Sequence, residues 1–188
     1  MAACLKPMPI ERSKRPVAAR RIAALARELL DLSSLCAIAT VTPAAQAHIN
    51  TAYFASTGEL ELVWLSEPGA THSRNIRANG SASVAVYHSA QKWGGSDRGI
   101  QLFGAARELK RGADGDAERL YAARFPNYRR DEAGAYRFYV FQPRRLKLFD
   151  EAELGAGVFV TARVDPEHRL LWDRTEIYRP RDGAIVVR

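Results

Sequence analysis

The first periodic segment of the chain lies between Ala18 and Leu32. Apolar residues recur there every three or four positions, at Ile22, Leu25, Ala26, Leu29, Leu30 and Leu32. This spacing places them on one stripe of an amphipathic helix that ends near Ser33 and Ser34. Such a helix can lie on a membrane surface, but packing on the protein's own core is far commoner, and we expect the latter.

Beyond this helix, short apolar runs alternate with polar residues at the period of two that is typical of β-strands. Turn signals such as Ser56-Thr57-Gly58 separate the runs. Gly99 and Gly104 interrupt one of them, which indicates a bulge or a close backbone approach. The predicted strands cover residues 35–41, 47–55, 59–65, 82–87, 98–109, 135–141 and 145–149.

Two further helices are expected between the strands. One opens near Thr71 or Ser73, both good N-cap residues, and stops at Asn79-Gly80. The other covers residues 114–124 and is broken at Phe125-Pro126. So many consecutive strands argue against a βαβ sheet. They favour a mainly β fold, a six- or seven-stranded antiparallel barrel with peripheral helices.

We expect one globular domain over residues 18–160. Residues 1–17 mix proline with basic residues and show no periodicity, which is typical of a flexible N-terminal segment. Residues 161–188 hold short apolar runs and Pro-Arg turns. We expect this C-terminal extension to pack on the barrel or on a partner subunit.

Composition narrows the class of protein. Of 188 residues, 47% are hydrophobic and 26% are charged, as in a soluble globular domain. The net charge of +7 comes without any nucleic-acid recognition motif, so no nucleic-acid partner is expected. No apolar run approaches a membrane span and no secretory h-region is present, so we expect a cytoplasmic protein. Cys4 and Cys36 are not expected to pair, and no residue spacing indicates a metal site.

The segment from Trp64 to Gly80 carries the candidate chemistry. A strand ends in a Ser-Glu-Pro-Gly turn, and a short helix follows. Free backbone N–H groups at a helix start, together with hydroxyl, imidazole and guanidinium groups, are typical of an anion site, with phosphate as the obvious ligand. An ordinary capped surface helix is the alternative. The candidate ligands are Ser66, Thr71, His72, Ser73 and Arg74.

These motifs, taken in order, resemble the FMN-binding split β-barrel superfamily of pyridoxamine 5'-phosphate oxidase, in particular its small bacterial members. The resemblance covers about residues 20–160. It rests on the strand–turn–helix at 63–80, on the strand Arg98–Gly104, and on Glu118–Pro126 followed by Leu146–Asp150. It implies a Greek-key-like split barrel that forms homodimers, with two FMN molecules at the interface.

The resemblance also implies where the cofactor lies. The phosphate is expected on the central helix and the ring against strand edges around Leu65. Asn50 and Thr51 are expected to contact the ring or the ribityl chain, and Gln101 to reach the cofactor from a later strand. Tyr53, Phe54 and Trp93 are expected to offer flat apolar surface to the flavin. The stretch 50–54 lacks the Arg and Lys that the oxidase uses there, so the resemblance does not extend to oxidation of pyridoxamine phosphate itself.

The sequence therefore predicts an FMN-binding flavoprotein, an oxidoreductase of unknown substrate in which the flavin performs the chemistry. No catalytic acid or base can be named. Two alternatives share the fold: a flavin- or haem-binding protein without turnover, and a deazaflavin-dependent reductase.

Overall fold

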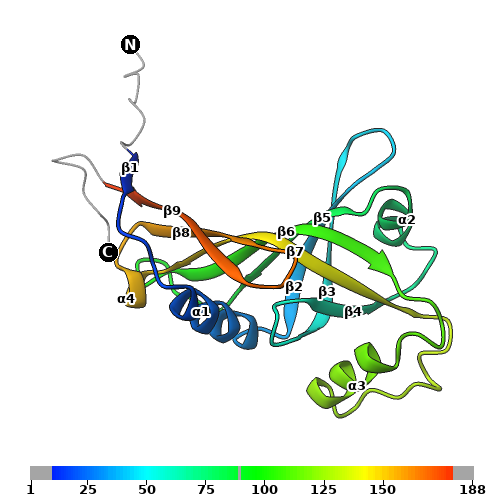
Figure 1. The fold of residues 1–188 in the computed structure, drawn as a ribbon. Coiled ribbons are helices and arrows are strands. Elements are labelled where there is room, and N and C mark those ends of the chain that lie inside the picture. Colours follow the sequence, from blue (N-terminus) through cyan, green and yellow to red (C-terminus); the bar gives the residue numbers. More distant parts are fainter. Residues whose placement is uncertain (1–9, 89, 180–188) are drawn as a thin grey trace.

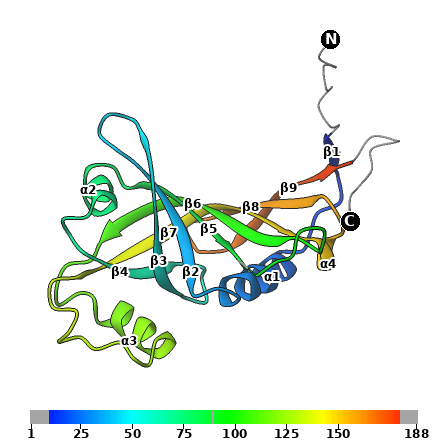
Figure 2. The same ribbon diagram turned by 180° about the vertical axis from the view of Figure 1, so that it is seen from behind.

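The computed structural model describes residues 10–88 and 90–179. In this part, nine strands form one antiparallel sheet with four helices around it (Figures 1 and 2). The strands are β1 (Ile10–Ser13), β2 (Leu35–Val41), β3 (Ala47–Ser56), β4 (Leu62–Ser66), β5 (Ser81–Tyr87), β6 (Arg98–Glu108), β7 (Arg137–Asp150), β8 (Val158–Val164) and β9 (Leu170–Tyr178). The helices are α1 (Ala19–Asp31), α2 (Thr71–Ala78), α3 (Gly115–Arg124) and α4 (Glu151–Leu154). The predicted mainly β fold with peripheral helices is confirmed.

Six of these strands close into a barrel. They run in the order β7–β4–β3–β2–β5–β6, and β6 pairs again with β7. β7 is 14 residues long and pairs with two different strands along one of its edges. Its first half pairs with β4, and Arg145–Phe149 pair with β8 along the same edge. β8, β9 and β1 therefore extend from the barrel as an arm of the same sheet (Figure 1).

The structure changes three boundaries expected from the sequence. Residues 10–13, assigned to the flexible segment, form β1 and pair with β9, while residues 1–9 lie outside the described part. The boundary at residue 160 falls inside β8, and β8 and β9 continue the barrel's sheet. The two strands expected at 135–141 and 145–149 are one strand, because a register shift opposite Gly104 accommodates Pro143.

The core fills the barrel and is closed by α1. The apolar stripe expected on this helix is buried, with Ile22 and Leu30 fully inaccessible to solvent. Inside the barrel, the Trp64 indole stacks on the Tyr139 ring at a centroid distance of 5.8 Å. Burial of such large side chains contributes about 1.5–3 kcal/mol each, so the barrel and α1 stabilise each other.

A second, smaller core lies outside the barrel, under α3. Ala117 and Tyr121 of this helix pack on Val63, Phe138 and Val140 of β4 and β7. The segment that leads from α3 to β7 is thereby held against the outer surface of the barrel wall. No helix in the described part of the chain is long and apolar enough to cross a bilayer.

Candidate functional site

The anion-binding segment expected from the sequence begins where β4 ends. The chain passes through a turn at Pro68-Gly69 and enters α2 at Thr71, after Ala70 in extended conformation. Ala70, not Thr71 or Ser73, is the N-cap residue, and no side chain caps the helix. Among the described residues, no acceptor is found for the backbone N–H groups of 71–73. The start of α2 therefore presents free donors and the positive end of the helix dipole.

Ser66 and His72 form a hydrogen-bonded pair across the turn. Ser66 Oγ and His72 Nε2 are 2.8 Å apart. Burial lowers the pKa of His72 below its ordinary value, nearby His48 lowers it further, and Glu67 opposes the shift. A neutral imidazole has one N–H donor. If Nε2 accepts from Ser66, Nδ1–H remains to donate; if Nε2 donates, the Ser66 hydroxyl hydrogen remains. Either tautomer leaves one donor of the pair for a ligand.

The other side chains of the first turn are engaged within the segment. Ser73 is fully buried, and its hydroxyl donates to the Glu67 carbonyl oxygen at 2.8 Å. The Arg74 guanidinium folds back and donates to the Gly69 carbonyl and, at 3.2 Å, to the Thr71 hydroxyl. Ser73 thus fixes the turn, while Arg74 is exposed and keeps three of its five N–H donors outside these two hydrogen bonds.

Asn50 and Thr51 lie on opposite faces of β3. Asn50 pairs with the core residue Ile38, so its side chain lies on the inner face, whereas Thr51 points outward. Asn50 Oδ1 is buried and has no hydrogen-bond partner among the described residues. A buried acceptor without a partner is costly, and a ligand N–H or O–H would satisfy it.

Four of the expected cofactor contacts lie on the outer surface of the barrel. Thr51 and Gln101 belong to one row of the sheet, separated only by Ala37 and Ala85, and are therefore about 14 Å apart. Tyr53 lies next to Thr51 on the same face, and Leu65 lies on the outer face of β4. Tyr53 and Leu65 line a hollow of about 370 Å³ together with Tyr121 and Tyr128.

The loop that carries Trp93 lies far from α2, the expected phosphate site, within one chain. Its loop joins the start of β6, where the Arg98 amide donates to Gln91. α2 lies near the other end of that strand, where Ala106 bonds to Gly80. The two ends are about 26 Å apart. Trp93 is 83% exposed. Phe54, also expected to offer a flat apolar surface, is fully buried in the barrel core.

Sequence reasoning missed two contributors. His48 was not among the candidate ligands, yet it lies close enough to His72 to lower the pKa of that imidazole. Asn75, within α2, donates to the Thr40 hydroxyl at 3.1 Å and so ties the helix to the barrel. The one sequence signal for this role is the position of Asn75, one helical turn after Thr71. Within the described residues, no group of three or more potential metal ligands is found.

Comparison with known proteins places this geometry in a family. Residues 22–150 match the family model described as Pyridoxamine 5'-phosphate oxidase. This match covers the barrel, α2 and α3. A search of curated protein sequences gave no match.

Solved structures share the fold at low sequence identity. A conserved hypothetical protein from Mycobacterium tuberculosis superposes with a TM-score of 0.61 at 17% identity, over 77% of this chain and 92% of its own. A pyridoxamine 5'-phosphate oxidase-related, FMN binding protein from Nostoc punctiforme gives 0.56 at 12% identity, over 86% and 95%. A heme binding protein from Mycobacterium smegmatis gives 0.55 at 14% identity, over 88% and 90%. These likenesses establish the fold alone.

Proposed function

The chain belongs to the pyridoxamine 5'-phosphate oxidase family, and we propose that it is an FMN-binding flavoprotein that performs a redox reaction on a small substrate. The observation that carries this proposal is the start of α2, where the free N–H groups of residues 71–73 lie beside the Ser66–His72 pair. The Nostoc protein, which has this fold and is FMN binding, supports the same conclusion.

The phosphate subsite is built mainly from neutral donors. Backbone N–H groups of residues 71–73, the Thr71 hydroxyl and the Ser66–His72 pair are available, and Arg74 is the nearby cation. A helix N-terminus binds phosphate through such groups without a cluster of cations. A dianionic phosphate beside His72 would also raise the pKa of its imidazole, and the protonated ring would then donate from both nitrogens.

The ring and ribityl subsites follow from an edge of β3: residues 47–53 pair with β2 but not with β4, so a cofactor that crosses this edge can contact both faces of the strand. The unpartnered Asn50 Oδ1 can accept from a ribityl hydroxyl on the inner side, and Thr51, Tyr53 and Leu65 present a surface for the ring outside. Bound FMN supplies hydride chemistry, and the protein binds it, orients it and excludes water. We assign no catalytic acid or base.

We also propose that the protein is a homodimer in which the outer face of β2, β3, β5 and β6 meets a second copy. Exposed apolar side chains border small residues there: Leu35, Ile49, Tyr53 and Tyr87 surround Ala37 and Ala85. Contiguous apolar surface of this kind marks an interaction site. Flat small-residue rows allow two sheets to approach closely, and the partner's loop could bring Trp93 to the cofactor.

The test compares FMN with riboflavin, which lacks the phosphate. Purified protein is mixed with each flavin and desalted, and binding is then measured by flavin fluorescence. We expect about one FMN per chain and weaker riboflavin binding. His72→Ala should weaken FMN binding by at least about tenfold and leave riboflavin binding unchanged. Arg74→Ala should have a smaller effect, because Arg74 is held by Gly69 and Thr71.

His88→Ala, which removes an exposed imidazole at the end of β5, is the matched control and should leave both affinities unchanged. Failure of the wild-type protein to retain either flavin would contradict the proposal. A Soret band in the purified protein would instead favour haem. Preference for a deazaflavin would favour the reductase alternative.

A further inference from the structure

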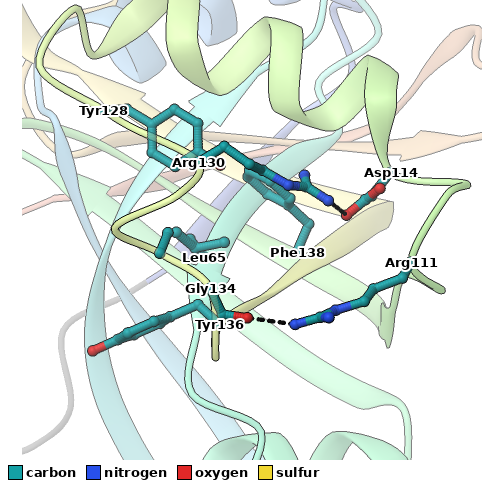
Figure 3. A pocket seen from close by; sticks show the side chains of 9 residues that line it. Leu65, Arg111, Asp114, Tyr128, Arg130, Gly134, Tyr136 and Phe138 are labelled. Carbon is teal, nitrogen blue, oxygen red and sulfur yellow. Dashed lines mark hydrogen bonds and ion pairs between the residues drawn. The ribbon is translucent and has the colours of Figure 1, made fainter.

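A second hollow lies beside the proposed flavin surface, between the two segments that flank α3 (Figure 3). Its volume is about 240 Å³. This is below the roughly 300–1,000 Å³ of pockets for drug-sized ligands, so a ligand of one ring fits its size. Phe138, 1% exposed, and Leu65 form the apolar wall, and the rings of Tyr128 and Tyr136 flank it.

The charges around this hollow are unequally paired. Arg130 binds Asp114 at 3.0 Å and Glu118 at 2.6 Å. Tyr128 also donates to Glu118, and Asp114 accepts from the Gly112 amide. These groups therefore form a closed network in which each carboxylate already has its cation.

Arg111 is different. Its side chain crosses the opening and donates to the Gly134 carbonyl (Figure 3). Among the described residues, that is its only side-chain hydrogen bond, and no carboxylate lies within 4.0 Å of it. A guanidinium has five N–H donors in a planar fork that matches a carboxylate. Most of these donors remain for a ligand at the mouth of an aromatic hollow.

The hollow adjoins the surface proposed for the flavin ring. Leu65, Tyr128 and Tyr136 line both this hollow and the one that contains Tyr53. A molecule with its charged end at Arg111 would therefore extend its other end towards Leu65. A substrate of the proposed flavoprotein would lie beside the cofactor in this position.

We propose that this hollow, the Arg111 pocket, binds a small aromatic carboxylate, with the carboxylate on Arg111 and the ring against Leu65, Tyr128 and Tyr136. The role of this pocket as a substrate subsite rests on the proposed flavin function. Binding of the aromatic acid to the pocket does not depend on that function. The pocket thus assigns the substrate class: a monocyclic aromatic acid, as opposed to a neutral or cationic molecule.

The experiment is a titration with 4-fluorobenzoate and its uncharged analogue 4-fluorobenzamide, followed by ¹⁹F NMR on the full chain without added flavin. We expect saturable binding of the acid and at least about tenfold weaker binding of the amide. Arg111→Ala should remove this preference. Lys110→Ala, which removes the same charge from an exposed neighbour outside the pocket, should preserve it. Tyr136→Ala should weaken acid and amide alike, because it removes a wall and not the charge.

Equal binding of acid and amide, equal effects of the Lys110 and Arg111 variants, or no saturable binding up to about 10 mM would overturn the proposal. Arg111 would then serve only to hold the segment at Gly134. FMN retention is measured on the same preparations. Acid binding without FMN retention would refute the flavin function and keep the pocket, and the reverse result would refute the pocket alone.

Discussion

Ser66 Oγ and His72 Nε2 lie 2.8 Å apart, so the last residue of β4 is joined to the second residue of α2. The hydrogen bond fixes the direction in which the helix start points. It also holds a half-buried imidazole beside a second histidine, His48, which disfavours its protonation. A structural contact and the charge state of the proposed phosphate site therefore depend on the same ring.

We expect this ring to make the protein less stable in mild acid. The pKa of His72 is lowered in the folded state, so the unfolded chain binds more protons once the pH falls below the ordinary value of 6.5. The free energy of unfolding should therefore fall with pH in that range. Urea unfolding at about pH 7.5 and about pH 5.5 measures the difference. His72→Gln should reduce the pH dependence and His88→Gln should not. A pH dependence that stays the same in His72→Gln would contradict this prediction.

Gly104 should tolerate no side chain. It lies at the register shift between β6 and β7, and a Cβ there would overlap the Gln142 carbonyl oxygen. We expect Gly104→Ala to lower the free energy of unfolding by about 2–3 kcal/mol, because two backbones must separate. Gly58→Ala is the control, since its Cβ would meet nothing within 4 Å. It should change stability by no more than about 0.5 kcal/mol. Chemical denaturation of both variants checks the prediction, and equal stabilities would refute it.

Arg98 is an ion-pair residue that neutralises a buried carboxylate. It binds Asp150, which is 1% exposed, at 2.7 Å, and also Glu28 of α1 at 2.7 Å. Arg98→Met should cost about 3–5 kcal/mol, because the buried Asp150 charge loses its partner. Arg21→Met breaks an exposed pair with Glu153 and should cost less than about 1 kcal/mol. Thermal and urea unfolding compare the two, and similar losses would show that Asp150 is stabilised by other groups.

Cys36 should be unreactive in the native protein. Burial raises the pKa of its thiol to about 12, and the backbone of Ala52 and the charge of Arg124 only partly offset this. Thiolate is the reacting species, so almost none is present near neutral pH. In a Cys4→Ser variant, a disulfide reagent should therefore label Cys36 only as fast as the protein unfolds. Rapid labelling under native conditions would contradict the burial of this residue.

Much of the fold can be predicted from the local pattern of apolar and polar residues. Alternation gave the barrel strands, and the apolar stripe gave α1, because burial of one face imposes each period. β1 could not be predicted, since Ile10–Ser13 has no alternation and is a strand only through pairing with β9. The single long β7 was also missed, because a proline normally ends a strand. Pro143 is tolerated within β7 because it lies at a register shift.

The candidate site was less accessible to sequence reasoning. Ser66 and His72 lie six residues apart, and the strand–turn–helix pattern brought them together correctly. Asn50 and Thr51 were grouped although the alternation of a strand already places them on opposite faces. Arg111 and Tyr136 carry no periodic signal, because they lie in connecting segments whose proximity depends on how α3 packs.

The pairing of β1 with β9 sets an order of assembly during synthesis. Ile10 lies opposite Tyr178, and Glu11 binds Arg179, 168 residues later in the chain. The six barrel strands end at Asp150, so all of them are synthesised before β9. β1 precedes all six barrel strands in the chain, and its partner β9 follows them. Until β9 is made, the backbone donors and acceptors of β1 lack the strand that they pair with in the folded protein.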